Sequence, residues 1–122
     1  MLKEFRNVLQ RPGEHQRRWF QSADEELIVW YEQDGSIHGF QLCYDRVREE
    51  RALTWINGKG YSHLKVDDGE IEPLIAKRTP ILVTNGLFDS EAVLERFNSV
   101  AAALPLEIRA LVSEKIRQYS RA

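Results

Sequence analysis

The sequence predicts an α+β domain: an antiparallel β-meander of about five or six strands, followed by two C-terminal helices packed on one face of the sheet. Up to residue 85, short apolar runs without helical period are separated by turn residues. From residue 89, apolar residues recur with the period of 3.6 that marks an amphipathic helix. Strands followed by helices favour α+β over a parallel α/β sheet. We therefore expect a single domain over residues 1–122, mainly β in 1–86 and a helical pair in 89–120.

The N-terminal half begins with turn and strand signals. Glu4–Gln10 and Gln16–Ser22 flank Pro12-Gly13 and predict a first hairpin. A clearer hairpin follows at Glu26–Tyr44, where two apolar runs flank Asp34-Gly35, a dipeptide suited to a two-residue turn.

The turn at Asp34-Gly35 determines which side chains of this hairpin share a face. It sets Trp30 opposite Gly39, so that the large ring covers the gap left by the missing side chain. The predicted core face consists of Leu27, Val29, Tyr31, His38, Phe40, Leu42 and Tyr44. The opposite face consists of Ile28, Trp30, Ile37, Gly39, Gln41 and Cys43. Since this second face is half apolar, we expect the chain itself, a partner or a ligand to cover it.

A second hairpin is predicted at Ala52–Val66, with two alternative turns. A turn at Gly58-Lys59 sets Thr54 opposite His63, whereas a turn at Asn57-Gly58 sets Thr54 opposite Tyr61. In both cases the inward face consists of Leu53, Trp55, Leu64 and Val66. The other face consists of Ala52, Thr54, Ile56, Tyr61, His63 and Lys65. Weaker strand signals follow at Ile71–Ala76 and Ile81–Thr84.

The C-terminal segment predicts two helices at an angle to each other over one face of the sheet. Asp89 or Ser90 is suited to cap the first helix, and Pro105 ends it and begins the second. The apolar stripe of the first helix is Val93, Leu94, Phe97, Val100, Ala101 and Leu104. That of the second is Ile108, Leu111, Val112, Ile116 and Tyr119.

Composition excludes several classes of protein. Hydrophobic content of 43% and charged content of 30% are ordinary for a folded domain and argue against disorder. A net charge of −2 gives no general attraction to nucleic acid or to an anionic membrane. A single cysteine, Cys43, excludes an intrachain disulfide and favours a reducing compartment. The sequence shows no membrane span and no secretory signal, so we expect a cytoplasmic protein.

His63 is the candidate for acid–base chemistry, because histidine titrates near neutral pH. Thr54 across the hairpin and the nearby Asp67 complete a candidate ligand site, although no spacing here indicates a catalytic triad. His63 with the acidic residues of Asp67–Glu72 contains oxygen ligands for a hard cation. This segment lacks the spacing of a calcium loop, so we interpret it as a turn and expect no metal and no cofactor.

Other motifs have simpler interpretations. Cys43 lies in mid-strand opposite Glu26, which predicts a buried and inert thiol. His38 is interpreted as a structural histidine that pairs with Tyr31. The run Arg17–Phe20 combines arginine with aromatic rings, as surfaces that bind single-stranded nucleic acid do, but an amphipathic strand explains it equally well. The glycines near Asn57 lack the pattern of a phosphate loop.

The phrases FQLCYD, ALTW and GYSHLKVDDGE resemble a family of small bacterial proteins of uncharacterised function. The resemblance covers residues 17 to 86 and implies no reaction, cofactor or site residue. From the residues themselves we expect a non-catalytic module that binds a protein partner or a second copy through the face around Trp30 and Gln41. The alternative is a small-molecule-binding protein or enzyme with its site at Thr54, His63 and Asp67.

Overall fold

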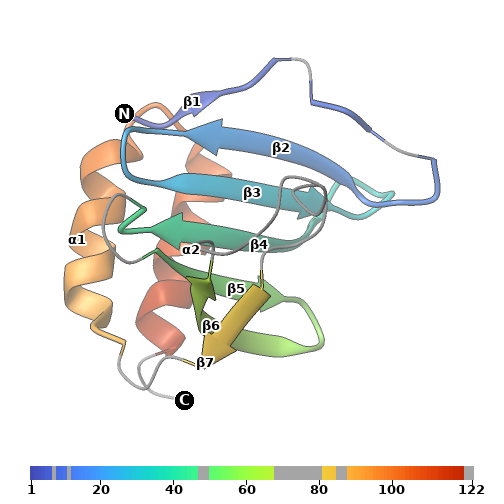
Figure 1. The fold of residues 1–122 in the computed structure, drawn as a ribbon. Coiled ribbons are helices and arrows are strands. Elements are labelled where there is room, and N and C mark those ends of the chain that lie inside the picture. The colour runs from blue at the N-terminus through green and yellow to red at the C-terminus, as the bar shows by residue number, and fades with distance from the viewer. Residues whose placement is uncertain (7, 11, 47–49, 68–80, 85–87, 120–122) are drawn as a thin grey trace.

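The computed structural model describes residues 1–6, 8–10, 12–46, 50–67, 81–84 and 88–119 (Figure 1). The strands are β1 (Lys3–Glu4), β2 (Gln16–Gln21), β3 (Glu26–Tyr31), β4 (Ile37–Tyr44), β5 (Arg51–Ile56), β6 (Gly60–Asp67) and β7 (Ile81–Thr84). The helices are α1 (Ser90–Val100) and α2 (Leu106–Tyr119).

The seven strands form one sheet in which each strand pairs antiparallel with its neighbours in the sequence. This order confirms the predicted meander followed by two helices. The predicted N-terminal hairpin is confirmed only in part: Lys3 and Glu4 pair with Gln21 and Phe20, but the described residues of the predicted strand beyond Glu4 are not in a strand. Ile81–Thr84 forms β7, whereas the strand predicted at Ile71–Ala76 lies outside the described residues.

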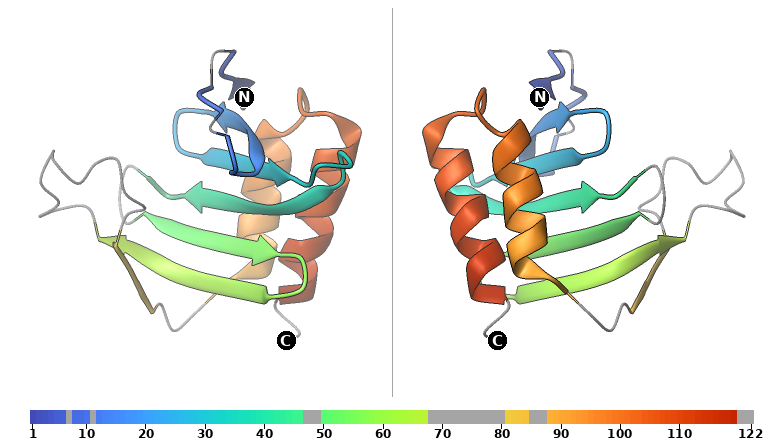
Figure 2. Two further views of the ribbon diagram at one scale, coloured as in Figure 1. Left: turned by 90° about the vertical axis from the view of Figure 1, so that its right-hand side faces the viewer. Right: turned by 90° about the vertical axis from the view of Figure 1, so that its left-hand side faces the viewer.

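Both helices lie against one face of the sheet, which we call the inner face (Figure 2). A row of paired inner-face residues crosses the sheet and is almost completely buried: Phe20, Leu27, Leu42, Leu53 and His63. The four apolar residues of this row belong to one core cluster with Val93 and Phe97 of α1 and with Ile108, Val112 and Ile116 of α2. The core therefore lies between the sheet and the helical pair.

The helix boundaries follow from the local sequence. Asp89 caps α1, because its carboxylate accepts a hydrogen bond of 3.1 Å from the Ala92 amide. The predicted apolar stripes face the sheet, with Phe97 and Ile116 fully buried. The amide of Leu2 donates a 2.8 Å hydrogen bond to the carbonyl of Val100, which ties the N-terminal segment to the end of α1.

The hairpin of β3 and β4 has the predicted register from Glu26 to Trp30, but not next to its loop. Trp30 lies opposite Gly39 as expected, but Tyr31 lies opposite Ile37 instead of His38. The loop contains three residues rather than two, because Glu32 pairs with Ser36 through a 2.8 Å backbone hydrogen bond. His38 therefore has no partner in β3 and forms a β-bulge, an extra residue of β4. Its predicted place against the core is wrong, and Ile37 packs there in its stead.

In the hairpin of β5 and β6, the observed register differs by one residue from each of the two predicted registers. Its loop also has three residues, closed by a 2.9 Å hydrogen bond from the Lys59 amide to the Ile56 carbonyl. Thr54 consequently lies opposite Ser62, and His63 lies opposite Leu53. Since a shift of one residue exchanges the faces of a strand, Tyr61 and His63 belong to the inner face and not to the predicted outer one.

The face of the sheet opposite the helices, which we call the outer face, has a central row of paired residues. The row consists of Trp19, Ile28, Gln41, Thr54 and Ser62. A second row beside it contains Arg17, Trp30, Gly39 and Ile56. Trp30 lies opposite Gly39 as predicted, and β5 approaches Gly39 closely from the other side. A Cβ atom there would lie 2.5 Å from the Trp55 carbonyl oxygen and 2.6 Å from the Ile56 side chain, so β5 itself occupies the space.

Candidate functional site

His63, the predicted acid–base residue, is enclosed by aromatic rings on the inner face. Its ring lies parallel to that of Tyr44, with 6° between the ring planes and 5.9 Å between the centroids, and contacts Phe88 and Tyr119 at centroid distances of 4.7 and 6.0 Å. Its Nε2 shares a hydrogen bond with the Tyr44 hydroxyl. Burial, together with the nearby Arg51, lowers the pKa of His63 to about 4. His63 is therefore neutral at physiological pH and is 5% exposed.

The three residues of the predicted ligand site do not meet. Thr54 lies in the central row of the outer face, whereas His63 points to the helices. Asp67 is the last residue of β6 and pairs with Ile81, and its side chain lies outside the described part of the structure. The expectation that Thr54 orients His63 is wrong, because it depended on a two-residue turn at Gly58-Lys59. Ligand binding by any of these residues stays a prediction.

Trp30 and Gln41, the other predicted binding residues, share the outer face with Thr54. Every residue of the central row is partly exposed, in contrast to the buried inner row. The row is uncharged, and the guanidinium of Arg17 lies over the Trp19 ring at 5.4 Å on its edge. Partly exposed aromatic and aliphatic side chains beside an arginine are typical of protein-binding surfaces.

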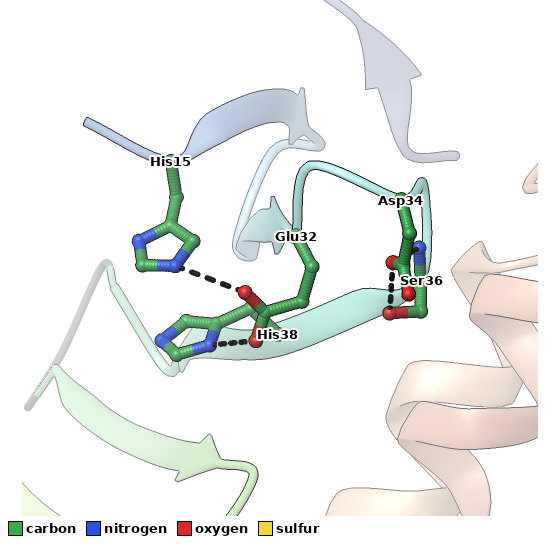
Figure 3. Close-up of polar contacts among 5 residues, drawn as sticks. All are labelled: His15, Glu32, Asp34, Ser36 and His38. Atoms are coloured by element: carbon green, nitrogen blue, oxygen red, sulfur yellow. Dashed lines mark hydrogen bonds and ion pairs between the residues drawn. The ribbon is translucent and has the colours of Figure 1, made fainter. Parts of the chain in front are cut away.

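A second polar site lies at the turn end of the sheet, where His15, Glu32 and His38 converge (Figure 3). His15 immediately precedes β2, Glu32 follows β3, and His38 is the extra residue of β4. The register of β2 and β3 places His15 beside Glu32, because Gln16 pairs with Tyr31. His38 Nδ1 lies 2.7 Å from Glu32 Oε2, and His15 Nε2 lies 3.3 Å from Glu32 Oε1.

The two imidazoles of this cluster stack on each other beside the shared carboxylate. Their centroids are 3.8 Å apart and their planes differ by 12°. The hydrogen bond from His38, together with the electrostatic influence of His38 and His15, lowers the pKa of Glu32 below its usual value. The carboxylate is thus ionised at neutral pH. His15 and Glu32 line an open depression of about 1080 Å³, whose wall includes Gln16 and Asn57.

Within the described part of the chain, two further titratable groups are buried outside these sites. Glu25, in the turn between β2 and β3, is 3% exposed, and burial together with the nearby Asp24 raises its pKa to about 7. Its Oε1 accepts no hydrogen bond from the described residues. Cys43 is buried opposite Glu26 as predicted, and burial with the neighbouring Glu50 and Glu26 raises the pKa of its thiol to about 12.

The sequence interpretation missed both the His15 cluster and Glu25. His15 follows no strand or helix period, and only the register of the N-terminal hairpin places it beside Glu32. The turn signal Pro12-Gly13 does not determine that register by itself. Glu25 lies in a short polar turn of the kind that normally faces solvent, so no sequence pattern marks it as buried.

Among the described residues, neither helix is long and apolar enough to cross a membrane. The resemblance of FQLCYD, ALTW and GYSHLKVDDGE to a bacterial family stays a prediction. Comparison of the chain with protein-family models, with curated proteins and with solved structures finds no match.

Proposed function

We propose that this chain is a non-catalytic binding module that associates with a second copy of itself through the outer face of its sheet. The observation that carries this proposal is the central row Trp19, Ile28, Gln41, Thr54 and Ser62, which is uncharged and partly exposed across five strands. Both helices lie on the other side of the sheet (Figure 2). Burial of such a row against a protein removes apolar area from water without desolvating a charge.

A second copy suits this surface because of its charge distribution. In a two-fold symmetric dimer, both copies contribute the same surface patch to the interface. A patch with a net charge would therefore face a patch of the same charge and be repelled. The central row avoids this repulsion, and the cation of Arg17 lies at its edge over Trp19. The polar side chains Gln41 and Thr54 supply hydrogen-bonding groups within the patch.

The geometry also supports the non-catalytic part of the proposal. Thr54 and Ser62, the hydroxyl residues of the row, lie opposite each other, while the neighbouring His63 points to the inner face. Activation of a hydroxyl nucleophile requires a base within hydrogen-bonding reach. His63 is separated from both hydroxyls by the sheet itself.

Sedimentation velocity over a range of protein concentrations tests the proposal. We expect a reversible monomer–dimer equilibrium that Ile28→Asp weakens by about tenfold or more, equivalent to about 1.4 kcal/mol. Leu106→Asp is the matched control, because it adds the same charge to a residue 78% exposed at the start of α2. Circular dichroism establishes that both variants are folded.

A chain that stays monomeric at millimolar concentration contradicts the proposal. So does equal weakening of the dimer by Ile28→Asp and Leu106→Asp, since general charge repulsion then explains the effect. Thr54→Lys provides a second variant in the central row, at a polar residue, should Ile28→Asp reduce stability.

A further inference from the structure

His15, Glu32 and His38 present the donor atoms of a transition-metal site. Imidazole nitrogens with one carboxylate oxygen form a common set of protein ligands for zinc and for non-haem iron. The ligand atoms of the three side chains all lie within 4.8 Å of one another. They come from three separate segments, and Figure 3 shows both rings directed at the two oxygens of the carboxylate.

We propose that His15, Glu32 and His38 bind one divalent transition-metal ion, of which zinc is the first to test. This site lies at the turn end of the sheet and goes beyond the self-association proposed above. The three side chains are 44%, 39% and 22% exposed, so an ion reaches them from solvent. Three protein ligands leave one position of a tetrahedral ion open. Two of the three residues, His15 and Glu32, line the open depression that also includes Gln16 and Asn57.

The metal-free arrangement already orients the ligands. Glu32 lies beside the two stacked imidazoles, with one carboxylate oxygen near each ring, and accepts a hydrogen bond from His38 Nδ1, the nitrogen that would bind the ion. Binding replaces that proton by the metal, releases the proton to solvent and leaves the carboxylate as the third ligand. Part of the conformational entropy that the three side chains lose on binding is therefore already lost in the metal-free protein.

Binding requires a limited rearrangement of the two rings. The bonds of a zinc ion are about 2.0–2.1 Å long, which places the ligand atoms of a tetrahedral site roughly 3.4 Å apart. The 2.7 Å contact between His38 Nδ1 and Glu32 must therefore widen, whereas His15 Nε2 and Glu32 are already 3.3 Å apart. An imidazole lone pair lies in the ring plane, so rings stacked within 12° of parallel must splay to share one ion. Loss of the His15–His38 stack is a direct signature of binding.

The bulge at His38 favours this function over a purely structural hydrogen bond. In an uninterrupted ladder His38 pairs with Tyr31, whereas the extra residue in β4 turns its side chain to Glu32 and His15. Bulges commonly redirect a side chain next to a functional site.

Titration of the full chain with zinc chloride by calorimetry tests the site. We expect one ion per chain, with the affinity reduced roughly tenfold or more by each of His15→Asn, Glu32→Gln and His38→Asn. Glu14→Gln is the matched control. Glu14 is exposed, adjoins His15 and lines the same depression, so this change removes an equal charge without removing a proposed ligand. His15→Asn alters an exposed residue that precedes β2, so the fold is retained.

NMR of the histidine ring nitrogens gives a second readout. We expect zinc to shift the signals of His15 and His38 and to leave the buried His63 unchanged. The proposal is overturned by the absence of binding at millimolar zinc, by an affinity that the three ligand variants leave unchanged, or by an equal loss in Glu14→Gln. Ile28→Asp should bind zinc normally, which separates this site from the self-association surface.

Discussion

The imidazole of His63 lies parallel to the phenol ring of Tyr44, and its Nε2 is hydrogen-bonded to the Tyr44 hydroxyl. This pair joins β6 to β4 across β5, beneath the end of α2. Phe88 and Tyr119 complete the enclosure, so the imidazole has little room for the water that would solvate a charge. The arrangement makes His63 a component of the core whose protonation opposes folding.

The first prediction concerns this protonation. The pKa of His63 is lowered from 6.5 to about 4 in the folded chain, so the unfolded chain binds more protons between these values. The free energy of unfolding should therefore rise with pH from 4 to 6.5, by on the order of 2–3 kcal/mol. Urea unfolding at several pH values measures it, and His63→Gln should remove this contribution. An unchanged pH dependence in His63→Gln contradicts the prediction.

Glu25 should have the opposite effect. The pKa of Glu25 is raised from 4.5 to about 7 in the folded chain, so the folded chain binds more protons between these values. The free energy of unfolding should therefore fall as the pH rises from 4.5 to 7 and the carboxyl ionises. The fall should be on the order of 3 kcal/mol at most. Glu25→Gln should thus stabilise the protein at neutral pH.

The pH ranges in which Glu25 and His63 change stability overlap. The two single variants and the double variant are therefore needed to separate the two contributions. A Glu25→Gln variant no more stable than the parent at pH 7 contradicts the prediction.

Gly39 should not accept any side chain. A Cβ atom at this position would lie 2.5 Å from the backbone oxygen of Trp55, which cannot move without disturbing the pairing of β4 and β5. We expect Gly39→Ala to lower the free energy of unfolding by about 2–3 kcal/mol. Gly58→Ala is the matched control, because Gly58 has open space but a φ of 83°, and should cost about 1–2 kcal/mol. A loss at Gly39 no larger than that at Gly58 indicates that the close approach is not limiting.

The thiol of Cys43 should be unreactive in the folded protein. Burial and the neighbouring carboxylates raise its pKa to about 12, so almost no thiolate is present at neutral pH. Modification by a chromogenic disulfide reagent should proceed only as fast as the protein unfolds, and it should be immediate in urea. Rapid stoichiometric modification of the native chain contradicts this expectation.

The class of fold was predictable because its signals are local. Asp34-Gly35 marks a turn, Pro105 separates two helical periods, and Asp89 is a capping residue at the start of α1. Each of these depends on a few adjacent residues and needs no knowledge of the tertiary structure. The register from Trp30 to Leu27 followed in the same way, because it lies beyond the irregularity at the hairpin tip.

The candidate sites were less predictable, because a single residue in a loop decides the face of every residue in the next strand. Asn57–Gly60 contains two glycines and is compatible with turns of two or three residues. The three-residue loop in the structure brings His63 inside and separates it from Thr54. In the hairpin of β3 and β4, the three-residue loop and the extra residue His38 likewise bring His38 together with His15 and Glu32. Periodicity alone does not distinguish these loops.

The strand order of the sheet also determines when the core is completed during synthesis. Each strand pairs with one that has just emerged, so hairpins can form early through short loop closures. Yet Leu27, Leu42 and Leu53 are buried in a cluster with residues of α1 and α2, which are translated after the strands. Until these helices leave the ribosome, the nascent sheet exposes an apolar surface. A stalled or truncated chain that lacks the helices is therefore expected to be a substrate for chaperones.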